Sequence, residues 1–185
     1  MDEKIEAFRE EALQWRDRAA EHPVPRRDAR TCASDGSLAK DNECKHCKEA
    51  QPLMQSLLAK YGNDVKLYFK HFPITSNNAL NAAIGAAAAR NQGKFWQFSD
   101  KVWEHSDHVT PAVVEAIANE LGLDFPRWYA DVGSEDVRAH VQRDKAEARA
   151  LEIRRTPAIF IDGRRYTDAL DVVSLTDWLD EALGR

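Results

Sequence analysis

Apolar residues recur at steps of three and four along residues 1–22, which predicts one amphipathic helix. These residues are Ile5, Phe8, Ala12, Trp15 and Ala19. Two prolines follow within the next three positions, and proline cannot continue a helix. We expect residues 1–22 to form a helical extension that packs on the chain's own body. A homodimer formed through the same helix is the alternative.

A second helical pattern starts directly behind a pair of cysteines, in the stretch "CKHCKEAQPLMQSLLAKYG". Leu53, Leu57 and Leu58 lie on one face of a helix of roughly 18 residues, and Gly62 is typical of a helix end. Pro52 lies inside this helix, where a kink is expected.

The period then changes to two, which indicates a strand. Val65, Leu67 and Phe69 alternate with more polar neighbours, and β-branched and aromatic residues are frequent in the stretch. Residues 77–152 return to a helical pattern almost throughout. Thr110 and Ser134 are the predicted N-caps of two of these helices.

The last part of the chain predicts a hairpin and a helix. Residues 158–161 form one strand, Asp162 and Gly163 the turn, and residues 164–166 the returning strand. The closing helix carries its apolar side chains at positions Leu175, Trp178, Leu179 and Leu183.

Composition narrows the function classes. The 185 residues are 43% hydrophobic, which supports a core without disulfide staples, and three cysteines are too few for a disulfide scaffold. The net charge is −5 with acids and bases mixed, so no nucleic-acid partner and no membrane span are expected. Residues 1–22 are acidic, unlike a signal peptide. We therefore expect a cytoplasmic protein, or a periplasmic one if a signal peptide was removed.

Cys44 and Cys47 are the candidate reactive residues. Two cysteines three positions apart on a helix can reach disulfide geometry. In the first turn, Cys44 would face backbone N–H groups that have no helical partner, and the helix dipole would stabilise its thiolate. Lys45 and His46 add positive charge beside it. We expect Cys44 to be the exposed nucleophile and Cys47 the buried, resolving thiol.

Two alternatives use the same cysteines differently. The chain could be a redox-inert binding module, or one stabilised by zinc bound to its cysteines. No second C-x-x-C motif and no pair of histidines with the usual zinc spacing is present, so we expect no metal site. His71 is expected to be structural, and His105 and His108 to be solvated. In the second alternative, the chain is a redox sensor or transfer enzyme in which Cys32 takes part in thiol-disulfide exchange with the other two cysteines.

Several sequence segments, taken in their order along the chain, resemble the DsbA-like thiol-disulfide oxidoreductases of the thioredoxin superfamily. "CKHC" matches the family's C-x-x-C, and Pro52 matches a helix-kinking proline. The other phrases are "VKLYFKHFPI", "QGKFWQFSDKVW", "NELGLDFPRW" and "RTPAIFIDGRRY". The resemblance implies an α/β fold, with a thioredoxin-like domain at 23–76 and 151–185 and a helical insertion at 77–150.

The resemblance also implies roles for individual residues. Cys44 would be the nucleophile, Cys47 the resolving cysteine, and His46 would tune the thiolate. Thr156 and Pro157 would form a cis peptide that faces the cysteines, and the backbone of Thr156 would bind a substrate chain as an added strand. The substrates would be protein thiols and disulfides, with a redox partner protein as a further candidate and no cofactor required.

The chain departs from the family pattern in three places. Lys45 stands where proline or glycine is usual, and Arg155 where glycine often precedes the Thr-Pro pair. The third departure is the strand that should lead into the cysteines, because the stretch "TCASDGSLAKDN" contains Asp35, Gly36 and Lys40. Such residues do not suit a buried central strand. We expect "ARTCAS" as a short substitute, a sheet without this strand, or a strand supplied by another chain.

Overall fold

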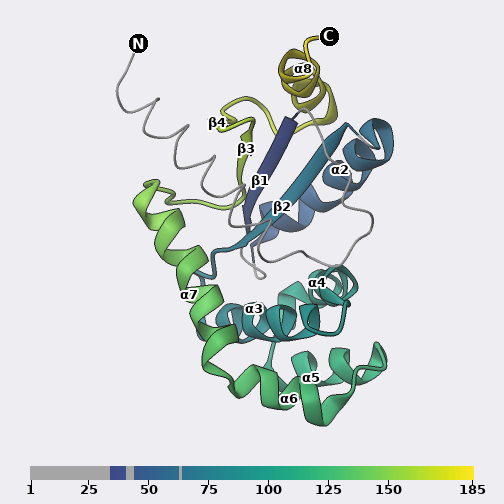
Figure 1. Ribbon diagram of the computed structural model, residues 1–185, viewed down its shortest axis with the longest axis vertical. Helices are drawn as coiled ribbons and strands as arrows, with labels where there is room; N and C mark the ends of the chain where they lie inside the picture. Colours follow the sequence, from purple (N-terminus) through teal and green to yellow (C-terminus); the bar gives the residue numbers. More distant parts are fainter. Residues whose placement is uncertain (1–33, 41–43, 63) are drawn as a thin grey trace. The chain divides into compact units, whose positions relative to one another are not determined.

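The computed structural model describes residues 34–40, 44–62 and 64–185 (Figure 1). The predicted helix at 1–22 and Cys32 lie outside these residues. The elements are β1 (Ser34–Lys40), α2 (Lys45–Tyr61), β2 (Val65–His71), α3 (Asn77–Arg90), α4 (Phe95–Glu104), a 3-10 turn η1 (Ser106–His108), α5 (Pro111–Glu120), α6 (Phe125–Gly133), α7 (Glu135–Ala150), β3 (Ala158–Ile161), β4 (Arg164–Arg165) and α8 (Val172–Ala182).

The chain divides into two compact units. The sheet unit contains residues 49–69 and 158–185 together with β1 up to Ala39. The helical unit contains residues 40–48, with the cysteine pair, and residues 70–157, with α3 to α7. The helices expected between residues 77 and 152 are therefore confirmed as α3 to α7.

The four strands form one sheet in the order β2-β1-β3-β4. Strand β3 is antiparallel to both of its neighbours. Gly36 of β1 lies opposite Ile161 of β3, and Arg165 of β4 lies opposite Phe160 of β3. Asp162 and Gly163 in the β3–β4 turn both have positive φ, 49° and 74°. A two-residue hairpin turn requires this left-handed conformation, so the predicted hairpin is confirmed.

The position of the first strand corrects the sequence prediction. Strand β1 occupies Ser34–Lys40, the stretch that contains Asp35, Gly36 and Lys40, and it lies between β2 and β3. Neither a sheet without this strand nor a strand from another chain is needed. Strand formation here depends on main-chain pairing with β3, which polar residues can make as well as apolar ones. The alternative strand at 29–34 falls almost wholly outside the described residues.

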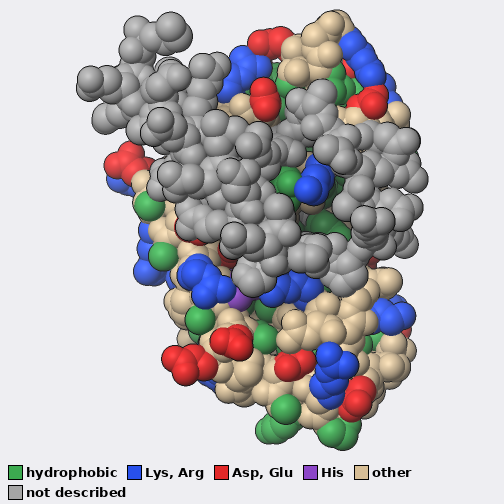
Figure 2. Space-filling view, viewed as in Figure 1, with side chains coloured by type: hydrophobic (Ala, Val, Ile, Leu, Met, Phe, Trp, Pro, Cys, Tyr) green, Lys and Arg blue, Asp and Glu red, His purple; other side chains and the backbone are tan. Residues whose placement is uncertain are grey.

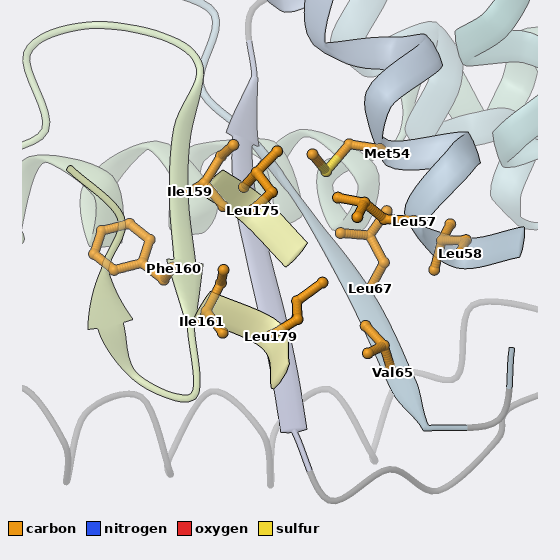
Figure 3. Close-up of a pocket in the computed structure, with 10 residues that line it drawn as sticks. All are labelled: Met54, Leu57, Leu58, Val65, Leu67, Ile159, Phe160, Ile161, Leu175 and Leu179. Atoms are coloured by element: carbon orange, nitrogen blue, oxygen red, sulfur yellow. The ribbon is translucent and has the colours of Figure 1, made fainter. Parts of the chain in front are cut away.

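The core of the sheet unit lies where α2 and α8 meet the sheet. Met54 and Leu57 from α2, Ile159 from β3, and Leu175 and Leu179 from α8 are all buried. Figure 3 shows these side chains converging on an apolar hollow that Leu58, Val65, Leu67, Phe160 and Ile161 also line. Of the predicted apolar face of the cysteine helix, Leu57 is buried in this core, whereas Leu53 and Leu58 are partly buried beside it.

Helix α3 is the centre of the helical unit, because its small side chains let four other helices approach closely. Contacts join it to α4, α5, α6 and α7, and its alanines from Ala86 to Ala89 are buried. Phe98 of α4 stacks on Trp128 of α6, with ring centroids 6.0 Å apart. The Trp128 indole N–H donates to the carbonyl of Gly85, with an N–O distance of 3.0 Å.

Helix starts in this unit follow the predicted capping residues. The Thr110 hydroxyl accepts from the N–H of Val113, and the Ser134 hydroxyl accepts from the N–H of Val137. Each cap satisfies a backbone donor that has no partner inside its helix. The sequence signals for these two helix starts are therefore confirmed.

The surface agrees with the mixed charge of the sequence. Figure 2 shows acidic and basic side chains interspersed on the face in view. Within the part of the chain that the structure describes, no helix has both the length and the apolar composition needed to cross a bilayer.

Gly85 provides a test of the close packing around α3. A Cβ at this position would lie 2.7 Å from Cγ1 of Val114 and 3.2 Å from the Phe98 ring. We predict that Gly85→Ala lowers the free energy of unfolding by about 1–3 kcal/mol, because an extra methyl group overfills the site. Chemical denaturation followed by circular dichroism measures this change.

Gly133→Ala is the matched control, since a Cβ there meets no atom within 4 Å. It should leave stability unchanged or raise it by about 0.5–1 kcal/mol, the ordinary gain from alanine in a helix. Equal effects of the two substitutions would contradict the packing argument.

Candidate active site

Cys44 is the residue that immediately precedes helix α2. Its carbonyl accepts the backbone N–H groups of Cys47 and Lys48 at 3.0 and 3.1 Å, which forms the first turn. The N–H of Cys47 also lies 3.3 Å from Sγ of Cys44 and donates to it. The sulfur therefore takes the place of a capping oxygen and faces the positive end of the helix.

The two cysteines differ in exposure as the sequence predicted. Cys44 is partly exposed, whereas Cys47 is fully buried. No disulfide joins these two described cysteines. An attacking thiolate must be accessible, and a thiol that acts only within the chain need not be. The geometry therefore fits Cys44 as the outer thiol and Cys47 as the inner one.

Thr156 supplies the second segment of the site. The thiol of Cys44 donates to the carbonyl oxygen of Thr156 at 3.2 Å, although the two residues are 112 positions apart. The peptide bond between Thr156 and Pro157 is cis, the isomer expected from the resemblance. Thr156 and Pro157 are both partly exposed, and the Thr156 carbonyl lies beside the Cys44 sulfur.

His46 and Lys45 occupy the first turn between the two cysteines. Both side chains are exposed. Cys44 thus contacts both the N–H of Cys47 and the carbonyl of Thr156, and His46 is exposed in the same turn. A tuning role for His46 stays a prediction.

One group of side chains of metal-ligand type occurs within the described residues. His71, His140 and Asp144 offer ligand atoms that all lie within 4.8 Å of one another. Two cations already engage this group. The ammonium of Lys70 lies 3.1 Å from Oδ1 of Asp144, and the guanidinium of Arg90 lies 3.2 Å from Nε2 of His140. A metal ion would have to enter beside two positive charges, so we interpret the group as an ion-pair network.

This network joins the end of β2 to helix α7. Asp144 is buried, and its Oδ2 accepts the backbone N–H of His71 at 2.9 Å. Lys70 also reaches Oε2 of Glu147 at 3.0 Å. A buried carboxylate needs such donors, because burial without them would cost several kcal/mol. The expected structural role of His71 agrees with its burial, and His105 and His108 are exposed as predicted.

Burial is the main reason why the pKa values of both histidines in the network are lowered. It lowers the pKa of His71 to about 3 and that of His140 to about 4. The charge of Asp144 opposes both shifts but does not overcome the loss of hydration. Both imidazoles are therefore neutral at neutral pH.

Sequence reasoning did not find this network, although α7 contained a signal for it. The buried positions of α7 are Val137, Val141, Asp144 and Ala148, at the spacing of one helix face. An acid on an otherwise apolar face indicates a buried partner, and the chain-distant Lys70 is that partner.

Comparison with known proteins gives the family context. Residues 40–181 match the sequence family described as Thioredoxin. A curated relative, the Na(+)/H(+) antiporter NhaA of Herminiimonas arsenicoxydans, is 34% identical over 140 residues. That match covers 76% of this chain but only 22% of the antiporter, so the chain spans about a fifth of the relative's length.

Solved structures share the fold. A thioredoxin-like oxidoreductase from Silicibacter pomeroyi DSS-3 is 27% identical with a TM-score of 0.76, and the match covers 83% of this chain and 88% of the other. The thiol-disulfide exchange protein alpha-DsbA2 from Wolbachia pipientis has a TM-score of 0.82 at 19% identity, with 98% of each chain covered. The catalytic domain of Proteus mirabilis ScsC has a TM-score of 0.74 at 19% identity, covering 90% and 97%.

The buried histidines predict an acid-sensitive fold. The unfolded chain protonates these side chains near pH 6.5, whereas the native state keeps them neutral down to about pH 4. The unfolded state therefore binds more protons in this window, and the free energy of unfolding falls as the pH drops from 6.5 towards 4. Urea denaturation at several pH values measures the slope. The share of His140 alone is on the order of 3 kcal/mol.

His140→Gln should remove part of this pH dependence, because glutamine does not titrate. His105→Gln is the control, since His105 is exposed and should leave the slope unchanged. If His140→Gln has the same pH profile as the unaltered protein, burial of this histidine does not govern its acid stability.

Proposed function

Since the chain belongs to the thioredoxin family, we propose that it is a thiol-disulfide oxidoreductase of the DsbA-like type that acts through Cys44 and Cys47. The observation that carries this proposal is the environment of the Cys44 sulfur. It accepts the N–H of Cys47 at the start of a helix and is partly exposed beside the Thr156 carbonyl. The exchange proteins named among the similar structures have the same fold.

The proposed reduction of a substrate runs in two displacements. The Cys44 thiolate attacks one sulfur of a substrate disulfide, so a mixed disulfide forms and the substrate's other sulfur leaves as a thiolate. Cys47, after losing its proton, then attacks the Cys44 sulfur and releases the second substrate thiol. Two electrons pass from the dithiol to the substrate, and the protein keeps a Cys44–Cys47 disulfide. Oxidation of a substrate dithiol is the same sequence in reverse.

Each part of the site has a physical task in this scheme. The N–H of Cys47 and the helix dipole stabilise the negative charge on Cys44 whenever it is the attacking or leaving group. Burial of Cys47 keeps that thiol away from other molecules until the mixed disulfide forms next to it. The exposed ammonium of Lys45 adds positive charge on the residue next to Cys44, and His46 is exposed in the same turn.

Thr156 and Pro157 would hold the substrate chain. The Thr156 carbonyl already meets the Cys44 thiol, so a substrate cysteine bonded to that sulfur comes within reach of the same main chain. An extended peptide can pair with such a backbone segment as an added strand. Side chains on either side would remain free to vary, which suits protein substrates of different sequence.

The first test is the redox equilibrium of the cysteine pair in graded glutathione buffers, read by alkylation and intact mass. We expect a reversible two-electron transition between dithiol and Cys44–Cys47 disulfide, with Cys32→Ser leaving it unchanged. A reduction potential of about −120 mV for the pair would indicate an oxidant, and one of about −270 mV would indicate a reductant. A pair that resists oxidation, or a native mass that includes zinc, would replace the proposal with a binding module.

The separate roles of the two cysteines are tested by single substitutions. Cys44→Ser should abolish exchange with a disulfide-bonded peptide, because the exposed nucleophile is lost. Cys47→Ser should instead trap the peptide on Cys44 as a stable mixed disulfide, visible as a mass increase that a reductant reverses. Trapping on Cys47 in a Cys44→Ser variant would reverse the assignment.

A further inference from the structure

Two exposed cations flank the reactive sulfur, one on each segment of the site. Lys45 directly follows Cys44, and Arg155 directly precedes Thr156, whose carbonyl lies 3.2 Å from the Cys44 sulfur. Adjacent residues are about 3.8 Å apart along the chain, so both side chains start within one residue of this contact. Each of the two segments that meet at the Cys44 sulfur therefore carries a basic residue next to this contact.

Both cations are available to a ligand. Neither Lys45 nor Arg155 forms an ion pair with any residue that the structure describes, and both side chains are exposed. Lys48 and Arg154, also exposed and basic, lie on the same two segments. The described part of the site thus presents more positive charge than its own acids Glu49 and Glu152 balance.

We infer that Lys45 and Arg155 select protein substrates whose reactive cysteine is next to an acidic residue. A guanidinium offers two parallel N–H donors that match a carboxylate, and an ammonium adds a compact charge. Both contacts would form in the mixed disulfide, when the substrate cysteine is bonded to Cys44. The preference would also act earlier, since opposite charges speed the encounter of the two molecules.

This inference rests on the proposed exchange function and assigns its substrate class. The attraction between exposed charges is screened at physiological salt over about 8 Å, so the preference should be strongest at low ionic strength. A preference due to apolar contacts would show no such salt dependence.

The test uses the full chain in its reduced form and three peptides. Each peptide carries one cysteine joined by a disulfide to the same chromogenic aromatic thiol, and the cysteine is flanked by glutamate, glutamine or lysine. Attack by Cys44 forms the peptide mixed disulfide and releases the coloured thiolate, which gives the second-order rate constant. At low salt we expect the glutamate peptide to react on the order of tenfold faster than the glutamine peptide. The lysine peptide should be slowest.

Charge-changing variants locate the preference. In the double variant Lys45→Gln/Arg155→Gln, the rate ratio between the glutamate and glutamine peptides should fall close to one. Because the ratio compares two peptides on one protein, a change in the reactivity of Cys44 itself cancels. Arg138→Gln is the matched control, since it removes an exposed cation of α7 that lies on neither segment, and it should keep the full ratio.

The sequence also places two acids, Asp41 and Glu43, just before Cys44, outside the described residues. Asp41→Asn/Glu43→Gln should therefore raise the ratio rather than lower it. Equal rates for all three peptides with the unaltered protein would overturn the charge preference and leave the exchange function intact. No reaction with any peptide would instead contradict the proposed function.

Discussion

The contact between the Cys44 sulfur and the Thr156 carbonyl is the interaction on which the candidate site depends. It joins residues 112 positions apart: Cys44 immediately precedes helix α2, and Thr156 lies between α7 and β3. A sulfur at a helix start is held by that helix alone. A main-chain carbonyl beside it requires a second segment at a defined position, and under the proposed function a substrate would be bonded and paired at this place.

The helical unit provides the conditions for this contact. The Cys44 and Thr156 segments both belong to it, together with the α3-centred bundle and the ion-pair network of Lys70, His71 and Asp144. Close packing around α3 requires small residues, and the network requires a buried carboxylate with fixed donors. Both features limit the movement of the backbone in the unit that carries the Cys44 sulfur.

The neutral histidines show how the same burial acts on stability and on charge. Asp144 would favour protonated imidazoles, but the loss of hydration outweighs its charge for both His71 and His140. The partly buried ammonium of Lys70 balances the charge of Asp144 without them. At the Cys44 sulfur the situation differs, because Lys45 and Arg155 are exposed and the effect proposed for them on a substrate depends on salt.

The sequence by itself determined most of the elements that the structure describes, two capping residues and the hairpin turn, and it predicted that Cys47 is more buried than Cys44. These are local properties. The hydroxyls of Thr110 and Ser134 accept backbone N–H groups three residues further along the chain, and Asp162 and Gly163 form the turn through their own positive φ angles. Only the tertiary structure decided that Ser34–Lys40 is the strand between β2 and β3. Backbone pairing with β3 stabilises this strand, although the side chains of the stretch do not favour one. The tertiary structure also decided that Asp144 meets Lys70, whereas the approach of Thr156 to Cys44 was predicted only through the resemblance to the family. Contacts between segments that are far apart in the sequence depend on how the whole chain packs, and a local pattern of residues does not specify them.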